Sequence, residues 1–346
     1  MDQMSQQVTS FIEMNDDSDL IYEKKEDPEK YFPDRFPESP IHYMLRTISY
    51  STLLTFHSCP RRFELSRLIP TVGNQERDED ADGHLDFGTV VGNGLQEFLV
   101  SKDINRALFR MFLDWNDNLE SERGMKSAKT FWDAIRAIKA VVELTNGPLA
   151  QYEVAVFNGK PAVELGFRID FGDGFTYRGK LDALLIHKVT REFLPLECKT
   201  TGSRYLDEAM YMNSSQGIGY GVVIDRVAHE MEVEYNSYDV FYPVYMTFKA
   251  EWVPFKFHKT NTARALWLQS ILFDINHIVQ YAEANYFPMR GESCFHFGRQ
   301  CRFFGTCNMS NNQLVGSNAP VKLDKRDDYS LEFDIFQLVE AQVGKE

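Results

Sequence analysis

The sequence has no apolar run long enough to cross a membrane, since no stretch of about eighteen consecutive hydrophobic residues occurs among its 346 residues. Its first residues lack the basic segment and apolar stretch of a secretory signal peptide. Five cysteines are too few for the disulfide framework of a small secreted protein. We therefore expect a cytoplasmic protein with no membrane partner.

An excess of positive charge is also missing, because 37 Lys and Arg residues face 51 Asp and Glu residues and give a formal net charge of −14. This balance argues against a protein that coats nucleic acid through a generally basic surface. It leaves room for an enzyme that combines a local basic groove with carboxylates gathered around a metal ion. The 43% hydrophobic content predicts a folded core.

One phosphate-binding motif is incomplete. Residues 174–180 have the spacing of a G-x-x-x-x-G-K loop, but Leu181 stands where such a loop needs Ser or Thr to hold magnesium. The residues that follow have the pattern of a strand, whereas the loop would lead into a helix. The motif therefore gives no support to an NTPase.

Composition divides the chain into three segments. Residues 1–44 contain an acidic, proline-bearing stretch at 13–38, with ten acidic and four basic residues, and we predict a flexible arm. Residues 45–310 carry regular helix and strand patterns and are expected to form the main domain. Residues 311–346 are a polar C-terminal extension whose last part could dock as a short helix.

Hydrophobic periodicity in the main domain changes from helical to strand-like and back. The patterns predict helices over 48–68, 87–100, 126–144, 204–226 and 262–286, and strands over 152–157, 162–171, 175–186, 192–200, 239–248 and 251–257. This order predicts an α/β core preceded by a helical N-terminal lobe.

Three polar side chains in apolar strands form the candidate catalytic group. Side chains alternate along a strand, so Glu197 and Lys199 point to one face and Cys198 to the other. If the strand carrying Asp182 pairs beside them, the two carboxylates converge on one cation, and oxygen ligands suit Mg²⁺ or Mn²⁺. The alternative is a solvated face with a cross-strand ion pair. Because unpaired charges are costly within apolar strands, we favour the metal site.

Several short motifs follow one another in a characteristic order. An S-x-S-x-L…C-P-x-x-F signature opens the series, G-K-L-D surrounds Asp182, E-C-K-T starts at Glu197, and Gln216 and Tyr220 form Q-x-x-x-Y. With the late cysteines, this set over residues 47–308 resembles the PD-(D/E)XK nuclease superfamily. It is most similar to the RecB-like branch, which includes the AddB nuclease domain and the CRISPR-adaptation exonucleases.

The resemblance implies a restriction-endonuclease-like fold, a mixed sheet flanked by helices with a helical N-terminal lobe. It implies that Asp182 and Glu197 bind Mg²⁺ or Mn²⁺, that Lys199 is the catalytic lysine, and that Gln216 and Tyr220 line the active site. The implied activity is metal-dependent hydrolysis of DNA, as an exonuclease on single-stranded or end-bearing DNA.

Nucleases of this branch act in recombination, repair and end processing in bacteria and their phages. Because the sequence carries no helicase motif, any unwinding would come from a helicase or recombination partner. The alternative function is a catalytically inactive, nuclease-like subunit that binds DNA or acts as a scaffold.

The sequence departs from the family at one metal ligand. The RecB-like branch usually has a histidine in a G-x-x-x-H pattern, but here the pattern runs from Gly88 to Gly92. Gln96 lies one turn later on the same helical face, and its side chain leans toward the helix N-terminus. We hypothesise that its amide oxygen replaces the histidine, directly or through a water. In the alternative, Gln96 bonds a neighbouring helix and the metal keeps an extra water.

Four cysteines form a second candidate site: Cys59 near the start of the main domain and Cys294, Cys301 and Cys307 near its end. Four thiolates suffice for an iron–sulfur cluster or a structural zinc. In several RecB-like nucleases one early and three late cysteines hold a [4Fe–4S] cluster, and the resemblance implies the same here. The wide spacing between the first two late cysteines leaves zinc, less favoured, and free thiols as alternatives.

Basic residues near the motifs are candidate nucleic-acid contacts: Arg61, Arg62, Arg178, Lys180 and Arg204. Aromatic residues such as Tyr205 lie among them, and basic groups mixed with stacking groups suit a single strand that passes a metal site. Ordinary surface charge is the alternative for about half of them. Nothing resembles a base-reading helix, so we expect little sequence preference.

Overall fold

The computed structural model describes residues 45–68, 79–115, 129–232, 239–296, 299–305, 307–308 and 334–344. The predicted acidic arm and most of the predicted C-terminal extension lie outside the described residues, so the predicted boundaries at residues 44 and 310 stay predictions. The elements are, in chain order, β1 (Thr47–Ile48), α3 (Tyr50–Ser58), α4 (Pro60–Leu68), α5 (Glu79–Ser101), α6 (Ile104–Asp114), α8 (Phe131–Asn146), β2 (Tyr152–Val154), β3 (Val156–Phe157), β4 (Lys160–Pro161), β5 (Val163–Asp170), β6 (Thr176–His187), β7 (Phe193–Leu196), β8 (Lys199–Thr201), α9 (Glu208–Met212), α10 (Ser215–Glu230), β9 (Asp239–Met246), β10 (Glu251–His258), α11 (Asn261–Glu283), η3 (Gly291–Ser293), β11 (Phe295–His296), β12 (Arg299–Gln300) and α13 (Ile335–Val343).

The chain divides into two compact units. The first unit comprises residues 1–68, 169–177 and 265–309, and the second comprises residues 69–168, 178–264 and 310–346. The first unit holds α3, α4 and the late cysteines. The second unit holds α5 to α10 and most of the strands.

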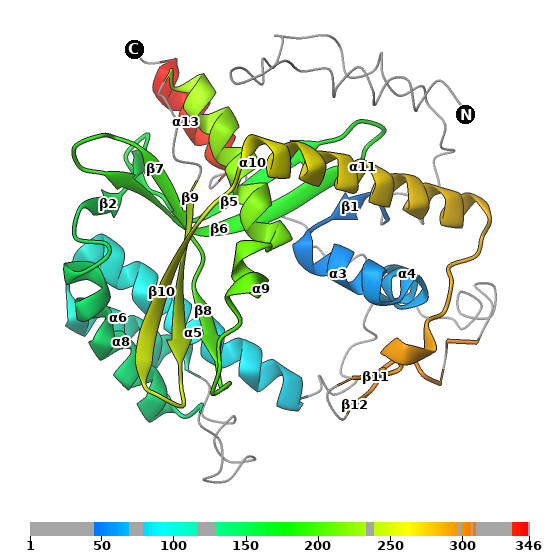
Figure 1. The fold of residues 1–346 in the computed structure, drawn as a ribbon, viewed down its shortest axis with the longest axis horizontal. Coiled ribbons are helices and arrows are strands. Elements are labelled where there is room, and N and C mark those ends of the chain that lie inside the picture. Colours follow the sequence, from blue (N-terminus) through cyan, green and yellow to red (C-terminus); the bar gives the residue numbers. More distant parts are fainter. Residues whose placement is uncertain are drawn as a thin grey trace. The chain divides into compact units, whose positions relative to one another are not determined.

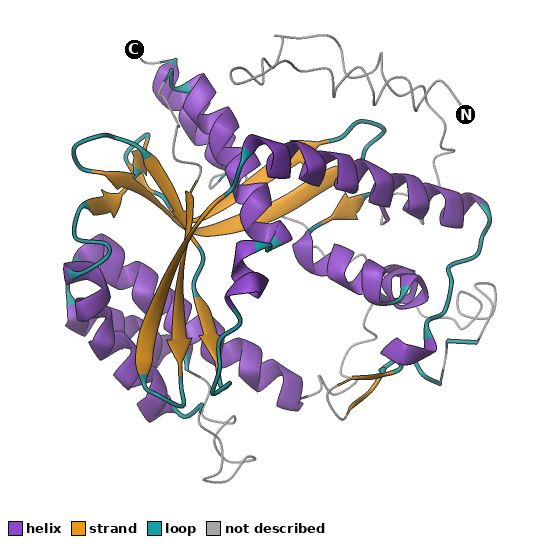
Figure 2. Ribbon diagram, viewed as in Figure 1, coloured by secondary structure: helices purple, strands orange, loops and turns teal. Residues whose placement is uncertain are grey.

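Eight strands of the described chain form one mixed sheet (Figures 1 and 2). Its path is β1–β6–β7–β9–β10, with β2 and β5 also paired to β6 and β8 paired to β9. The β6–β7 and β9–β10 pairs are antiparallel, whereas β7–β9 and β8–β9 are parallel. In the second unit α5 and α8 contact one face and α10 contacts the other (Figure 1). The predicted restriction-endonuclease-like sheet flanked by helices is thus confirmed.

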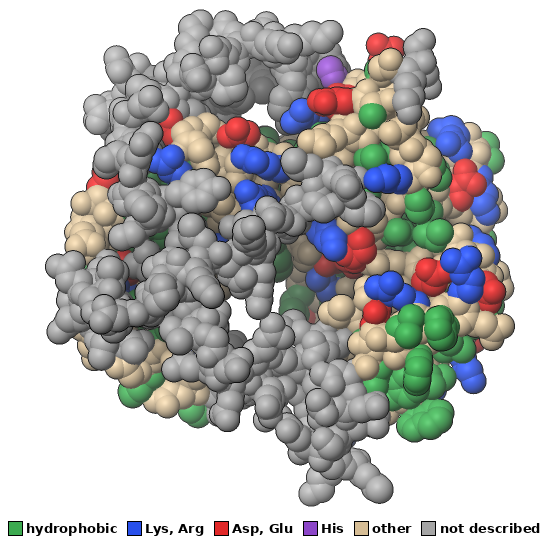
Figure 3. All heavy atoms as spheres, turned by 180° about the vertical axis from the view of Figure 1, so that it is seen from behind, with side chains coloured by type: hydrophobic (Ala, Val, Ile, Leu, Met, Phe, Trp, Pro, Cys, Tyr) green, Lys and Arg blue, Asp and Glu red, His purple; other side chains and the backbone are tan. Residues whose placement is uncertain are grey.

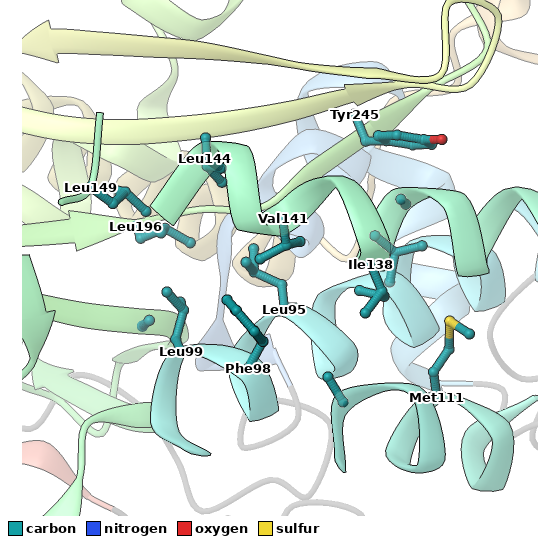
Figure 4. Packing of buried hydrophobic residues seen from close by; sticks show 14 of the residues in the cluster. Leu95, Phe98, Leu99, Met111, Ile138, Val141, Leu144, Leu149, Leu196 and Tyr245 are labelled. Carbon is teal, nitrogen blue, oxygen red and sulfur yellow. The ribbon is translucent and has the colours of Figure 1, made fainter. Parts of the chain in front are cut away.

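The core of the second unit lies where α5, α6 and α8 pack together against the sheet (Figure 4). Leu95 and Leu99 of α5 and Ile138 and Val141 of α8 are buried there. Gly94 allows the two helices to approach closely, because a Cβ at this position would lie 2.7 Å from Cδ1 of Ile138. This packing fixes α5 against the sheet.

Capping side chains decide where several helices begin. Ser49 starts α3 and Thr130 starts α8, each through a capping box. The predicted continuous helix over 204–226 is wrong, because a loop precedes α9 and a break separates α9 from α10. At that break the Ser214 side chain accepts a hydrogen bond from the backbone N–H of Gly217 and starts a new helix. α6 is a helix that the sequence pattern did not predict.

Two close contacts fix the start of α10. A Cβ at Gly217 would lie 1.9 Å from Oη of Tyr242 on β9, so only glycine permits this approach. Lys259 is 1% exposed and donates to the carbonyls of Tyr211, at 3.1 Å, and Met212. Burial lowers the pKa of Lys259 to about 8. These contacts hold the end of α9 and the first turn of α10 against the sheet.

An aromatic cluster stabilises the first unit. Phe56 of α3 lies 5.4 Å from Phe63 of α4 and 6.0 Å from Tyr281 of α11, measured between ring centroids. Phe287 closes the cluster, at 5.7 Å from Tyr281 and 6.5 Å from Phe63. These contacts join the early helices to the segment that precedes the late cysteines.

α13 packs against α10 in the second unit, as the docking of a short C-terminal helix requires. The Arg226 guanidinium lies 4.3 Å from the ring centroid of Phe336.

Exposed hydrophobic side chains gather elsewhere on this unit, over α6 and α8, as Figure 3 shows, and include Phe109 and Trp132. None of the described helices is long and apolar enough to cross a membrane.

Candidate active site

Asp182 and Glu197 lie opposite each other across the β6–β7 ladder. Ala183 pairs with Leu196 in this antiparallel ladder, so the next position in the same register brings Asp182 beside Glu197. Like charges in directly opposite positions destabilise a sheet. The structure therefore brings the two predicted ligands together at a position where a cation would relieve their repulsion.

The sheet divides where β7 ends and β8 begins. The backbone N–H of Glu197 donates to the carbonyl of Phe241 on β9, at 2.9 Å, while the N–H of Cys198 donates to Oδ2 of Asp182, at 2.7 Å. The Asp182 carboxylate thus takes the place of a backbone acceptor. The Cys198 side chain packs against the core on the other face, as strand alternation predicts.

The pKa of Asp182 is raised well above its usual value by burial and then by the negative charge of Glu197. The Cys198 amide and the Lys199 ammonium lower it, but by less than these two effects raise it. Without a cation the site favours a proton on Asp182. A divalent cation between the two carboxylates would displace that proton.

Glu197, Lys199, Gln216 and Tyr220 form a closed ring of hydrogen bonds. Lys199 Nζ donates to Oε1 of Glu197 at 2.5 Å and to Oε1 of Gln216 at 3.1 Å. Gln216 Nε2 then donates to Oη of Tyr220 at 2.8 Å, and Tyr220 donates to Oε2 of Glu197 at 2.5 Å. Because the ammonium can only donate and the carboxylate can only accept, both paths around the ring run from Lys199 to Glu197. Both oxygens of Glu197 are therefore held in place.

The ring is closed to water on the carboxylate side and open at the lysine. The side chain of Glu197 is 5% exposed and that of Lys199 is 38% exposed. Burial, and then the charges of Glu197 and Asp182, raise the pKa of Tyr220 well above its usual value, so its phenol remains a donor. The exposed end of Lys199 is the part of the ring that a substrate can reach.

Glu164 on β5 is a third carboxylate near this group, and the sequence analysis missed it. After burial and Glu197, its charge also contributes to the raised pKa of Asp182. Glu164 forms an ion pair with Lys180 and accepts a hydrogen bond from Nε2 of Gln96 at 2.6 Å. The signal was present in the sequence, because Glu164 is an acidic residue within an apolar strand, the criterion that singled out Asp182.

The backbone at Glu164 has a φ of 53°, in the left-handed region that non-glycine residues rarely adopt. Such a conformation costs on the order of 1 kcal/mol or more and persists where the surroundings determine it. Inside β5 it changes the direction of the side chain relative to regular strand alternation. In this direction the Glu164 carboxylate accepts the hydrogen bond from Gln96 and forms the ion pair with Lys180.

Gly88, Gly92 and Gln96 form one stripe of α5. A Cβ at Gly88 would lie 3.4 Å from Oγ1 of Thr200 on β8, and Gln96 reaches Glu164 on β5. Gly92, between them, is buried, yet a Cβ built there meets nothing within 4 Å. Space is therefore present at the position where a histidine was expected. The hydrogen bond of Gln96 goes to strand β5, whereas the alternative reading of the sequence expected a bond to a neighbouring helix.

The predicted nucleic-acid contacts lie in different surroundings. Arg61 is 8% exposed, and its guanidinium binds Glu64 at 2.5 Å and the carbonyl of Cys307 at 3.2 Å. Both partners lie inside the first unit, so this guanidinium has a structural role there, and its predicted phosphate contact stays a prediction. The other four are half-buried or exposed: Arg62, Arg178, Lys180 and Arg204.

The four cysteines of the second candidate site all belong to the first unit and carry free thiols. The β11–β12 hairpin places Cys301 opposite Cys294, and the N–H of Cys301 donates to the carbonyl of Cys294 at 2.7 Å. Burial, and then the charges of Cys59, Cys294 and Cys301, raise the pKa of Cys307, so the four thiols lie within electrostatic reach. No three or more His, Cys, Asp or Glu side chains in the described part of the chain are grouped as around a metal ion.

The donor set at Asp182 and Glu197 fits a hard divalent cation. Mg²⁺ is commonly bound through one or two carboxylates and keeps several waters, so a pair of carboxylates is sufficient. Burial, and then the charge of Glu197, raise the pKa of Asp182, and a cation bound beside the two carboxylates would offset both effects. Soft ligands are absent from this face, because the thiol of Cys198 points into the core.

Comparison with known proteins gives a matching family model and similar solved structures. The family model described as the PD-(D/E)XK nuclease superfamily matches residues 47–308. No curated protein matches the chain. A solved structure from Eubacterium rectale, named "Putative exonuclease", has a TM-score of 0.45 and 13% sequence identity, and the match covers 74% of this chain and 88% of that chain.

The repulsion at Asp182 predicts a stability change that depends on pH. The folded pKa is raised above that of the unfolded chain, so the contribution of Asp182 to stability decreases as pH rises from about 4 through the folded pKa. Asp182→Asn removes the ionisation and retains an acceptor for the Cys198 N–H. We expect its melting temperature in EDTA at pH 8 to exceed that of the wild type by about 2–4 °C.

Differential scanning calorimetry between pH 4 and pH 8 checks this result. The difference between the two proteins should shrink toward pH 4, where Asp182 is protonated in the folded state and about half protonated in the unfolded chain. Added Mg²⁺ should stabilise the wild type but not the variant, because only the wild type keeps both carboxylates. A variant less stable than the wild type at pH 8 in EDTA would contradict the assignment.

Proposed function

The chain belongs to the PD-(D/E)XK nuclease superfamily, and we propose that it is a Mg²⁺-dependent exonuclease acting on single-stranded or end-bearing DNA. The observation that carries the proposal is the meeting of Asp182, Glu197 and Lys199 at the division of the sheet. We further propose that the enzyme works in the cytoplasm in recombination, repair or end processing, with unwinding supplied by a helicase partner.

The two carboxylates provide the metal ligands of the proposed site. Donors at both oxygens keep Glu197 in one orientation, and the Cys198 N–H does the same for Asp182. A divalent ion bound between them supplies Lewis acidity toward the phosphate and lowers the pKa of a bound water. The Cys198 carbonyl and waters would complete the ligand set.

Lys199 acts at the open end of the ring. Its ammonium is held by Glu197 and Gln216, and its side chain is 38% exposed, so a phosphate oxygen or a water can approach it. A preorganised positive charge stabilises the charge that develops on the phosphate in the transition state. Gln216 and Tyr220 support catalysis by positioning Lys199 and Glu197.

Gln96 has a narrower role than the sequence analysis proposed. Its amide N–H₂ group is committed to Glu164, so only the amide oxygen remains to approach the metal or a bound water. We propose that Gln96 acts mainly by directing Glu164 toward the site. Lys180 shares this carboxylate and is half exposed, so it is also a candidate phosphate contact.

Loss of the lysine charge should abolish hydrolysis. We expect Lys199→Ala to cut end-labelled linear DNA at least about 100-fold more slowly than the wild type, because a fixed positive charge at the phosphate is removed. Lys139→Ala, on the exposed side of α8, is the matched control and should retain full activity. Gel electrophoresis with Mg²⁺ or EDTA, on linear and circular single strands and on duplexes, measures both variants.

The substrates in this assay also separate the alternatives. An exonuclease cuts linear DNA and leaves closed circles intact. An inactive scaffold binds DNA without metal-dependent loss of label in the wild type. Equal rates for the wild type and Lys199→Ala would remove the proposed catalytic group.

The open space at Gly92 predicts that a histidine there adds a metal ligand. We expect Gly92→His to bind Mn²⁺ about tenfold more tightly than the wild type, since one imidazole ligand is gained. Gly92→Ala is the matched control, because it fills the same space and favours the helix without adding a ligand. Isothermal titration calorimetry measures both, and equal affinities for the two variants would place Gly92 away from the metal.

We also propose that Cys59, Cys294, Cys301 and Cys307 hold a [4Fe–4S] cluster. All four cysteines belong to the first unit, and the N–H of Cys301 donates to the carbonyl of Cys294, which supports this; the thiols are not grouped as metal ligands in the described residues. A cluster would join the early helices to the late hairpin covalently and stabilise this unit.

The cluster predicts a brown protein. Anaerobically purified wild type should absorb near 400 nm and contain about four iron atoms per chain. Cys301→Ser should lose the absorption and melt at lower temperature, whereas Cys198→Ser, outside the proposed cluster, should keep the absorption. One zinc per chain would instead indicate a structural zinc site. A protein that contains neither iron nor zinc would indicate four free thiols.

A further inference from the structure

A group of exposed side chains lies where β8 and the β9–β10 hairpin end. β8 runs parallel to β9, with Lys199 paired to Val244. Beyond this ladder, Thr247 donates to the carbonyl of Thr201 through its backbone N–H at 2.9 Å and through its hydroxyl at 3.2 Å. The loop after β8 and the turn after β9 are therefore joined at their bases (Figure 1).

The tips of these two segments expose aromatic rings. Tyr205 is 85% exposed and Phe248 is 55% exposed. The Arg204 guanidinium lies over the Phe248 ring, 4.6 Å from its centroid. The guanidinium of Arg204 thus stacks on the Phe248 ring, and Tyr205 is the next residue in the sequence. Such a combination of a cation and aromatic rings favours contact with flat, negatively charged ligands.

The exposed tyrosine lies on an ordered loop. The Ser203 hydroxyl donates to the carbonyl of Tyr205 at 2.7 Å and accepts from its N–H at 3.2 Å. The N–H of Ser203 in turn donates to Oγ1 of Thr201 at 3.1 Å. These bonds order the backbone of the loop and leave the Tyr205 ring in water, where it is available for stacking.

The group lies within reach of the candidate catalytic lysine. Phe248 is four residues beyond Val244, the register partner of Lys199, which corresponds to about 13 Å along a strand. That span matches about four stacked nucleotides of a single strand. A strand whose phosphate sits at Lys199 can therefore extend its flanking bases to these rings.

We propose that Tyr205 and Phe248, with Arg204 stacked on Phe248, form a platform on which unpaired nucleobases stack beside the catalytic site. The inference rests on the proposed nuclease function and names its substrate class as single-stranded nucleic acid. Paired bases inside a duplex present only their edges, so the platform selects unpaired strands without reading sequence. Arg204 adds attraction for the backbone phosphates.

Binding to three fluorescein-labelled probes in EDTA tests the platform without interference from cleavage. The probes are a 12-nucleotide oligothymidylate, an abasic oligomer of the same length and a blunt duplex, measured by fluorescence anisotropy. We expect Tyr205→Ala and Phe248→Ala each to weaken oligothymidylate binding about 5- to 100-fold. Binding of the abasic oligomer and the duplex should change less than twofold.

Two controls separate stacking from other effects. Phe109→Ala removes a ring of similar exposure on α6, at the other face of the sheet, and should bind all three probes as the wild type does. Phe248→Tyr should restore binding, whereas Phe248→Leu, apolar but without a ring, should not. Under Mg²⁺ the platform variants should raise the KM for single strands and leave kcat unchanged.

The outcomes for platform and nuclease are distinguishable. Wild-type affinity in both alanine variants, or equal loss on the abasic oligomer, overturns the platform even if metal-dependent cleavage is intact. Selective loss on oligothymidylate supports the platform even if the wild type cuts no DNA, in which case the nuclease function fails alone. A wild type that neither binds nor cuts single strands overturns both.

Discussion

The repulsion between two carboxylates, held face to face where a sheet divides, is the constraint on which the site depends. Asp182 and Glu197 lie one position beyond the last pair of the β6–β7 ladder, Ala183 and Leu196, and the backbone N–H of Cys198 donates to the Asp182 side chain. A sheet without a cation gains nothing from this arrangement. The protein accepts a local loss of stability in order to hold a concentrated negative charge at a fixed place.

The surrounding structure keeps this unfavourable group in place. Tyr220 and Lys199 donate to the two oxygens of Glu197, and Gln216 joins the two donors into a ring. α10 supplies both Gln216 and Tyr220, and the missing side chain of Gly217 lets that helix approach the sheet. Rigid elements thus hold every member of the ring, as a preorganised site requires.

The face opposite the ring shows a second adaptation. α5 presents glycine where the sequence resemblance predicted a histidine, and a left-handed residue in β5 brings another carboxylate to the next turn of the helix. After burial and Glu197, the charge of Glu164 is a further cause of the raised pKa of Asp182.

Local patterns in the sequence were sufficient for the strand alternation that puts Glu197 and Lys199 on one face and Cys198 in the core, and for the helical spacing of Gln216 and Tyr220. These depend only on the repeat of the backbone. The burial of Arg61 and the direction of Glu164 were decided by the tertiary structure. Each depends on a partner distant in sequence or on a strained backbone angle, and no local period encodes either.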